Sequence, residues 1–173
     1  RARSLARRAP PRGSKAALRT QACQEAAERV VACLACLLVT QAMIVHAYDG
    51  SRIGCALLSD GVGATLAATA FVPYFTYSGN MAVSGSVAPM TTTGTTQTFA
   101  YALSGVDPLC SSGAGSAGNS CGIHIHAGAT CTADALGHYY TGSVTSDPWT
   151  AIAYTSDGTG ASAGSVAVTT GGS

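Results

Sequence analysis

Two histidines separated by one residue are the first sign of chemistry in this chain. His124 and His126 stand in the stretch CGIHIHAG, whose apolar residues and flanking glycines are typical of a short strand. Side chains alternate between the two faces of a strand, so both imidazoles are expected to point the same way. Such a pair can supply two metal ligands, or it can simply form a polar face of a sheet.

Further ligand candidates lie far from this pair in the sequence. The other two histidines are His46, in MIVHAYDGSRIGC, and His138, in ALGHYY, and an acidic candidate, Asp147, opens DPW. Three or four imidazoles suit copper, zinc, iron or nickel, and geometry and availability choose among them. The sequence therefore predicts a metal site if the fold brings these residues together.

The segments that must position these residues are predicted to be short strands. Residues 64–75, 80–90 and 96–106 are β-rich, and in the third of these Phe99, Tyr101 and Leu103 occupy alternate positions. Residues 150–170 contain two runs joined by Asp-Gly and glycine-rich turn signals, which predict a hairpin. Several short strands with regular turn signals favour an all-β sandwich or barrel.

Charge divides the chain into a basic head and an acidic body. All nine lysines and arginines lie at or before Arg52, whereas five aspartates follow Ile53. An acidic body argues against nucleic acid as a partner, because phosphate neutralisation needs Lys and Arg. Cys110 and Cys121 flank the loop SSGAGSAGNS and could close it as a disulfide, which would mainly restrict the unfolded chain.

Residues 1–42 are predicted to be an N-terminal extension. Ser14 could cap a helix through the Ala-rich stretch that follows it. Residues 30–42 are mostly apolar and are a candidate signal or membrane anchor, although a full span needs about 20 apolar residues. The alternatives are a helix packed on the domain or an unrelated leader. Cys33 and Cys36 have CxxC spacing without a second Cys/His pair, so we expect buried small residues there.

The stretches CGIHIHAGATC, LGHYY, DPW and SDGTG together resemble the copper/zinc superoxide dismutase family. In this resemblance His124 and His126 match the two copper ligands of the family's His-x-His strand. His138 matches the imidazole that bridges copper and zinc, and Asp147 matches the zinc-binding aspartate. Cys131 matches the cysteine of the loop that follows the strand.

The family's closing elements occur earlier in this chain, in IVHAYDGSRIGCALL. There His46 matches the last copper ligand, and Arg52 matches the arginine that guides superoxide to the metal. Cys55 matches the cysteine that bonds to the loop cysteine, here Cys131. The resemblance thus implies a Cys55–Cys131 disulfide, which would be a second bond beside the candidate Cys110–Cys121 bond of the Gly/Ser loop.

The permuted order leaves two explanations. One is a tandem array, in which this chain is a piece holding the tail of one repeat and most of the next. The other is one permuted barrel over residues 43–173, with C-terminal-type strands in 43–58 and N-terminal-type strands in 59–173, joined through the hairpin-length linker SDGVG. The resemblance implies a Greek-key, immunoglobulin-like sandwich or barrel, and we expect the permuted barrel for this chain.

The implied activity is the disproportionation of superoxide to dioxygen and hydrogen peroxide at copper, with Arg52 and His138 as catalytic residues. The interval YYTGSVTS between His138 and Asp147 holds no further histidine, so zinc is doubtful and the chain resembles the copper-only branch. The alternatives are a non-catalytic extracellular or cell-surface β module and a copper storage protein. Cupins also use His-x-His but add a downstream Glu, and residues 43–173 contain none.

Two disulfides would need an oxidising compartment, so we expect an extracellular or secretory location. Membrane contact is expected only through residues 30–42, and neighbouring repeats of the same chain are expected partners. Superoxide is the expected substrate.

Overall fold

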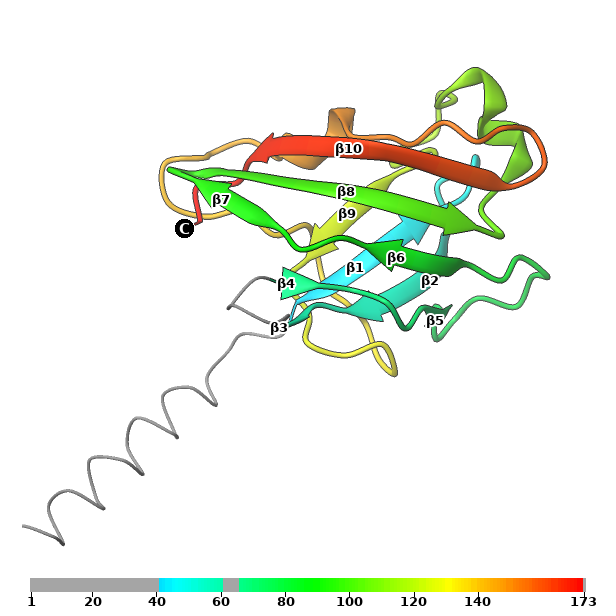
Figure 1. Ribbon diagram of the computed structural model, residues 1–173, viewed down its shortest axis with the longest axis horizontal. Helices are drawn as coiled ribbons and strands as arrows, with labels where there is room; N and C mark the ends of the chain where they lie inside the picture. Colours follow the sequence, from blue (N-terminus) through cyan, green and yellow to red (C-terminus); the bar gives the residue numbers. More distant parts are fainter. Residues whose placement is uncertain (1–40, 61–65, 173) are drawn as a thin grey trace, which may run out of the picture. The chain divides into compact units, whose positions relative to one another are not determined.

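The computed structural model describes residues 41–60 and 66–172, which form an all-β structure with two short 3₁₀ helices (Figure 1). This confirms the predicted all-β class. The predicted N-terminal helix, the apolar segment up to Thr40, and Cys33 and Cys36 lie outside the described residues. The elements are β1 (Ala42–His46), β2 (Arg52–Leu57), β3 (Ser59–Asp60), β4 (Leu66–Ala67), β5 (Val72–Pro73), β6 (Ser84–Val87), β7 (Thr91–Thr93), β8 (Thr96–Ser104), η1 (Pro108–Ser112), β9 (Ile123–His126), η2 (Pro148–Ala151) and β10 (Ala161–Thr169).

The first antiparallel sheet has the order β5-β2-β1-β9. Strand β1 pairs with β2 on one side and with β9 on the other, so that Ile44 lies between Cys55 and His124. In β9, Ile123 and Ile125 pack in the main core, whereas the two histidines lie on the opposite face. The expected alternation of the His-x-His strand is therefore present.

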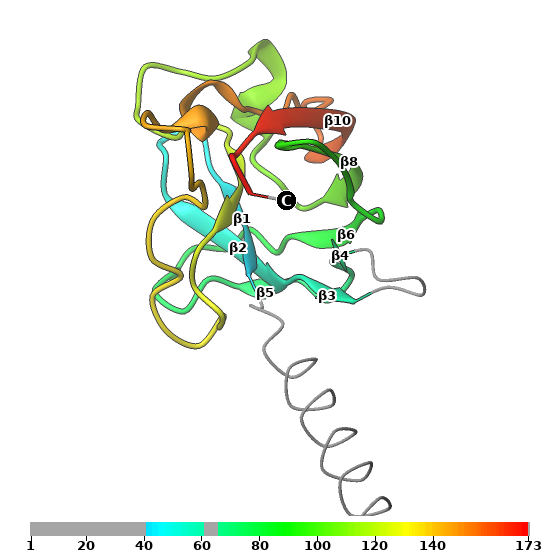
Figure 2. The ribbon, with the colours of Figure 1, turned by 90° about the vertical axis from the view of Figure 1, so that its left-hand side faces the viewer.

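The second antiparallel sheet has the order β10-β8-β6, and β7 also pairs with β8. Strand β8 buries Phe99, Tyr101 and Leu103 and exposes the residues between them, as its sequence predicted. Strand β10 pairs with β8 along its whole length, from Ala161 to Thr169. The two sheets face each other as layers (Figure 2), and the main apolar core fills the space between them.

The end of β2 leads into a small hairpin. Strands β3 and β4 pair antiparallel on either side of residues 61–65, and β2 also pairs antiparallel with β5. The β-rich residues 64–75 contain two short strands, β4 and β5. Ala68 pairs with Val87 of β6 while Pro73 pairs with β2, so the segment crosses from one sheet to the other and forms only two-residue strands.

The predicted hairpin within residues 150–170 is wrong. Its second run is β10, but its first run forms η2 followed by extended residues that lie in no strand. Ala153 pairs with Gly122 instead, and the Tyr154 amide donates to the carbonyl oxygen of Cys121. The backbone groups needed for a hairpin with β10 are therefore used on the segment that precedes β9.

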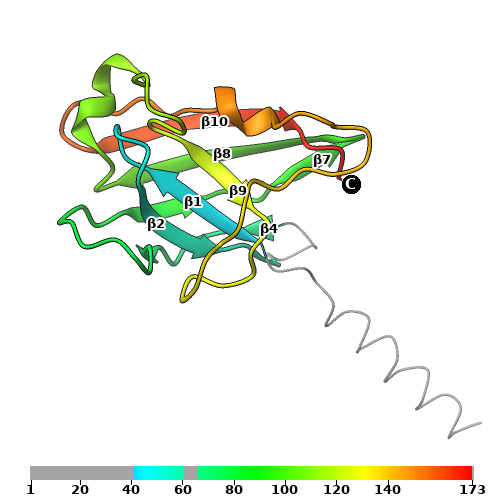
Figure 3. The same cartoon turned by 180° about the vertical axis from the view of Figure 1, so that it is seen from behind.

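The long segment between β9 and η2 passes along the outer side of the first sheet (Figures 2 and 3). Its backbone bonds back to the strands, with the Tyr139 amide donating to the carbonyl oxygen of Ile125. Because this covering segment lies on the outer face and the core lies on the inner face, every residue of β1 and β9 is buried. The outer face of the first sheet is thus an enclosed environment, and it carries the histidines.

Both expected disulfides are present, Cys55–Cys131 and Cys110–Cys121. The first joins β2 to the covering segment, and the second closes the Gly/Ser loop that precedes β9. Two disulfides in a domain of this size are typical of extracellular or secreted proteins. In the part of the chain that the structure describes, no helix has the length and hydrophobicity needed to cross a membrane.

Candidate metal centre

All four histidines of the chain meet at one place on the outer face of the first sheet. His46 ends β1, His124 and His126 belong to the neighbouring β9, and His138 comes from the covering segment, where it pairs with His126 in an isolated bridge. One ring nitrogen from each residue lies within 4.8 Å of the others. The pairing of β1 with β9 therefore brings together residues that are far apart in the sequence.

Each ring is fixed by a hydrogen bond from one nitrogen to an oxygen atom. A carbonyl oxygen can only accept, so the bonded nitrogen carries the proton and the other nitrogen presents a lone pair. Three of these bonds go to backbone carbonyls: His46 Nδ1 to Gly50 at 2.9 Å, His124 Nε2 to Ile152 at 2.8 Å and His126 Nδ1 to Leu136 at 2.8 Å.

The opposite nitrogens of these three rings have no partner within the structure. His46 Nε2, His124 Nδ1 and His126 Nε2 are buried and make no hydrogen bond. A buried polar atom left unpaired costs about 1–3 kcal/mol, so native proteins rarely tolerate three together without a ligand. Two nitrogens that bind one metal at about 2 Å are at most about 4 Å apart, and the four nitrogens here lie within 4.8 Å of one another. A small inward shift of the rings would therefore let them hold one metal ion.

His138 completes the group and is held by a carboxylate. Its Nδ1 lies 2.6 Å from Oδ2 of Asp147. The other carboxylate oxygen of Asp147 accepts from the Trp149 amide at 2.9 Å and caps η2. Asp147 thus orients His138 and lies outside the group of four nitrogens, which among the described residues is the group that can hold a metal.

Burial keeps the three strand histidines neutral. It lowers the pKa of His46 to about 4 and the pKa values of His124 and His126 to about 3, with smaller contributions from neighbouring charges. Neutral imidazole is the form that binds metal. The rings are therefore in the metal-binding form throughout the physiological pH range.

Arg52 lies beside the histidines. It faces His46 across the β1–β2 pair, next to a register shift at Val45 and His46. Its guanidinium donates from Nη2 to the Leu136 carbonyl oxygen at 2.7 Å, and from Nη1 to the Tyr74 hydroxyl at 2.6 Å and to Asp134 Oδ1 at 2.8 Å. The Leu136 carbonyl thus accepts from both Arg52 and the ring of His126.

The sequence did not single out Tyr74, Asp134 or Leu136. One signal for them did exist, because the expected Cys55–Cys131 bond ties the start of the covering segment to the strand that carries Arg52. Any carboxylate shortly after Cys131 could then reach the guanidinium. Leu136 carried no such signal, since its role depends on its backbone carbonyl.

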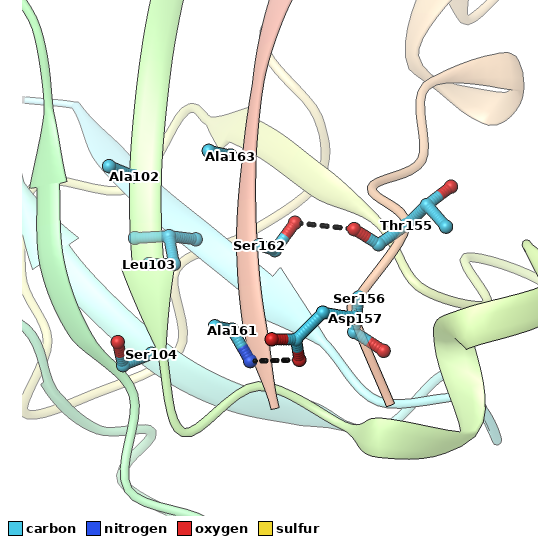
Figure 4. A pocket seen from close by; sticks show the side chains of 9 residues that line it. All are labelled: Ala102, Leu103, Ser104, Thr155, Ser156, Asp157, Ala161, Ser162 and Ala163. Carbon is cyan, nitrogen blue, oxygen red and sulfur yellow. Dashed lines mark hydrogen bonds between the residues drawn. The ribbon is translucent and has the colours of Figure 1, made fainter. Parts of the chain in front are cut away.

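A separate shallow hollow lies beside β10 (Figure 4). It shares no residue with the histidine group and is lined by small and uncharged residues except for Asp157. The Asp157 side chain accepts from the Ala161 amide and holds the turn before β10. We therefore assign the chemistry of this domain to the histidines. The lining residues are Ala102, Leu103, Ser104, Thr155, Ser156, Asp157, Ala161, Ser162 and Ala163.

The described residues support a metal-binding centre made of four imidazoles, a donor set that suits copper, zinc, iron and nickel. The support rests on the geometry of the cluster and on its unpaired nitrogens. No protein-family model, curated protein or solved structure matches this chain.

Proposed function

We propose that this chain is a copper-binding domain of the superoxide dismutase type, which converts superoxide to dioxygen and hydrogen peroxide. The observation that carries the proposal is the convergence of three buried, unpaired ring nitrogens with His138. The order of the residues around that cluster adds to it. The chain first supplies His46, Arg52 and Cys55. It then supplies the His-x-His strand, the loop cysteine Cys131, and finally His138 and Asp147.

The proposal includes a Greek-key barrel in permuted order. The strand that carries His46 pairs directly with β9, and β2 continues through β3 into β4. Both features favour a site formed entirely within this chain. They argue against a site whose residues come from two different repeats. The disulfide Cys55–Cys131 supports the same arrangement, because it joins the early strand to the late loop.

We propose copper as the ion and a single-metal site. His138 uses its Nδ1 to bond to Asp147 and keeps only Nε2 for the cluster. An imidazole that bridged two metals would need both nitrogens. The covering segment between His138 and Asp147 contains no other histidine, so a second four-ligand site has no donors there.

Copper held by these histidines would supply one-electron redox chemistry. The protein's own contribution is to hold the four rings, through three carbonyl oxygens and the Asp147 carboxylate, with lone pairs directed inward. His46, His124 and His126 are at most 1% exposed, whereas the His138 side chain is 7% exposed. His138 is thus the least enclosed of the four rings. Arg52, which pairs with His46 across β1 and β2, would offer a positive charge to an anion that reaches the group.

The test is a direct assay on the full chain. The protein is loaded with copper, its copper content is measured, and superoxide loss is followed by stopped-flow absorbance. We expect one copper per chain and rapid superoxide loss, both abolished in His126→Ala. Asp157→Asn is the matched control because it changes an exposed side chain that contacts no histidine. Circular dichroism checks that each variant is folded.

Three outcomes separate the candidate functions. Copper binding with dismutation supports the proposal. Copper binding without dismutation favours storage or a structural module with the same fold. A folded wild-type chain that takes up no copper overturns both readings of the histidine cluster. We also propose that the domain is extracellular or in the secretory pathway, which mass spectrometry without reductant tests through the two disulfides.

A further inference from the structure

Among the described residues, Arg52 is the one lysine or arginine that lies close to the histidine group. Residues 41–173 contain no other lysine or arginine and six aspartates. Any anion that approaches the metal centre therefore meets a negative domain with a single positive group near its target. The contacts and charges around the Arg52 guanidinium therefore determine how strongly the site attracts anions.

Three groups engage the guanidinium at once. Arg52 Nη1 donates to the Tyr74 hydroxyl and to Asp134 Oδ1, and Nη2 donates to the Leu136 carbonyl oxygen. The same Asp134 oxygen also accepts from the Tyr74 hydroxyl at 3.1 Å and from the Leu136 amide at 3.0 Å. Tyr74 is buried, and its ring centroid lies 5.3 Å from the guanidinium carbon. Arg52 is thus clamped from two sides.

The backbone of this clamp is under strain. Leu136 has φ of 63°, in the left-handed region that bulky residues rarely adopt, and the residue is 55% exposed. The conformation aims its carbonyl at both His126 and Arg52 and its amide at Asp134. Strain kept at such a point is typical of a functional site.

We propose that Asp134 sets the anion selectivity of the metal centre by pairing with Arg52. This inference rests on the proposed function for the role of Arg52 as the anion-binding group. Asp134 holds the guanidinium in place and at the same time cancels much of its charge. An incoming anion must compete with a carboxylate that the protein itself supplies, so the site disfavours weakly bound anions and admits those that also bind the metal.

The first test is the affinity of the copper-loaded full chain for azide, a small anion that binds copper, measured by absorption and electron paramagnetic resonance. Asp134→Asn keeps an acceptor oxygen for Arg52 but removes the charge. We expect it to bind azide about three- to tenfold more tightly at low salt, with a smaller gain at high salt because Asp134 is 64% exposed. Asp157→Asn removes the same charge elsewhere and should leave the azide affinity unchanged.

The second test needs neither copper nor activity. In the metal-free full chain labelled with ¹⁵N-arginine, the guanidinium signals of Arg52 are assigned by their loss in Arg52→Lys. We expect separate, slowly exchanging signals in the wild type and in Asp157→Asn. Averaging is expected in Asp134→Ala, and partial averaging in Tyr74→Phe, which lacks the hydroxyl that Arg52 contacts.

The results distinguish this inference from the proposed function. Arg52 signals that are the same in wild type and Asp134→Ala would overturn the clamp. An azide affinity of Asp134→Asn equal to that of Asp157→Asn would overturn the charge effect. A chain that meets both expectations but does not remove superoxide would refute the dismutase function and still support anion selection by Asp134.

Discussion

His138 and Asp147 are joined by a hydrogen bond of 2.6 Å between Nδ1 and Oδ2. Because Asp147 is itself held by the amide of Trp149 at the start of η2, the ring of His138 has one orientation. Of the four rings, His138 is the one that depends on a side chain for its position. Its contribution to the site should therefore be sensitive to a single substitution outside the cluster.

We predict that Asp147→Ala weakens copper binding by about 10–100-fold, the usual cost of losing a carboxylate that orients a ligand histidine. Asp147→Asn should lose less, because its amide oxygen can still accept one of the two bonds. Quenching of Trp149, the single tryptophan of the chain, is a suitable readout, since its ring lies 6.0 Å from that of His124. Unchanged affinity in a folded Asp147→Ala protein would show that Asp147 does not orient His138.

We predict that Gly122→Ala disturbs the site although residue 122 is not a ligand. A Cβ atom at Gly122 would overlap with Cε1 of His124, so the ring must move. Gly118→Ala is the matched control in the same loop, because a Cβ there meets nothing within 4 Å. Copper affinity should fall in the first variant and stay unchanged in the second. Equal affinities would mean that the ring has room to shift without loss.

The metal-free chain should lose stability as the pH falls below about 6.5. The pKa values of His46, His124 and His126 are lowered in the folded state, to about 4, 3 and 3. The unfolded chain therefore binds protons first. For three imidazoles the free energy of unfolding should decrease by up to about 4 kcal/mol per pH unit between about pH 6 and the folded pKa values.

Urea unfolding of the metal-free chain at about pH 7.5 and about pH 5 measures this effect. His46→Gln, which removes one titrating ring, should show a shallower dependence. A free energy of unfolding that is the same at both pH values would contradict the burial of neutral rings.

The two disulfides should contribute unequally to stability. Cys55 and Cys131 are 76 residues apart, and Cys110 and Cys121 are 11 apart. On loop entropy alone, removing the first bond as a double Cys→Ala variant costs about 4.5 kcal/mol and removing the second about 3 kcal/mol. Thermal unfolding at fixed pH compares the two variants. A larger loss for Cys110→Ala/Cys121→Ala would point to a structural role of the Gly/Ser loop beyond loop closure.

Local patterns predicted the strands whose two faces differ. The alternation of Phe99, Tyr101 and Leu103 located β8, and the spacing of His124 and His126 placed two rings on one face. Both predictions depend only on the two-residue period of a strand. The Cys110–Cys121 bond was predicted from the loop that these cysteines flank, and the four histidines from their residue type. The Cys55–Cys131 bond came from the family resemblance alone.

Tertiary competition explains why the predicted hairpin within residues 150–170 is wrong. The run before β10 has hairpin signals, yet Ala153 pairs with Gly122 and not with β10. Nothing local to either segment reveals that choice, because pairing partners far apart in sequence compete for the same backbone groups. Spacing rules likewise do not predict the Arg52–Asp134 pair, since 82 residues separate its members. Only the expected Cys55–Cys131 bond indicates that the two residues lie near each other.

Copper titration with electron paramagnetic resonance of the full chain tests the central claim most directly. The account predicts one Cu(II) per chain with hyperfine structure from nitrogen ligands, and a changed or lost signal in each of the single His→Ala variants at positions 46, 124, 126 and 138. Copper bound without nitrogen hyperfine structure, or a spectrum that is unchanged in all four variants, would contradict the assignment of these histidines as a copper centre.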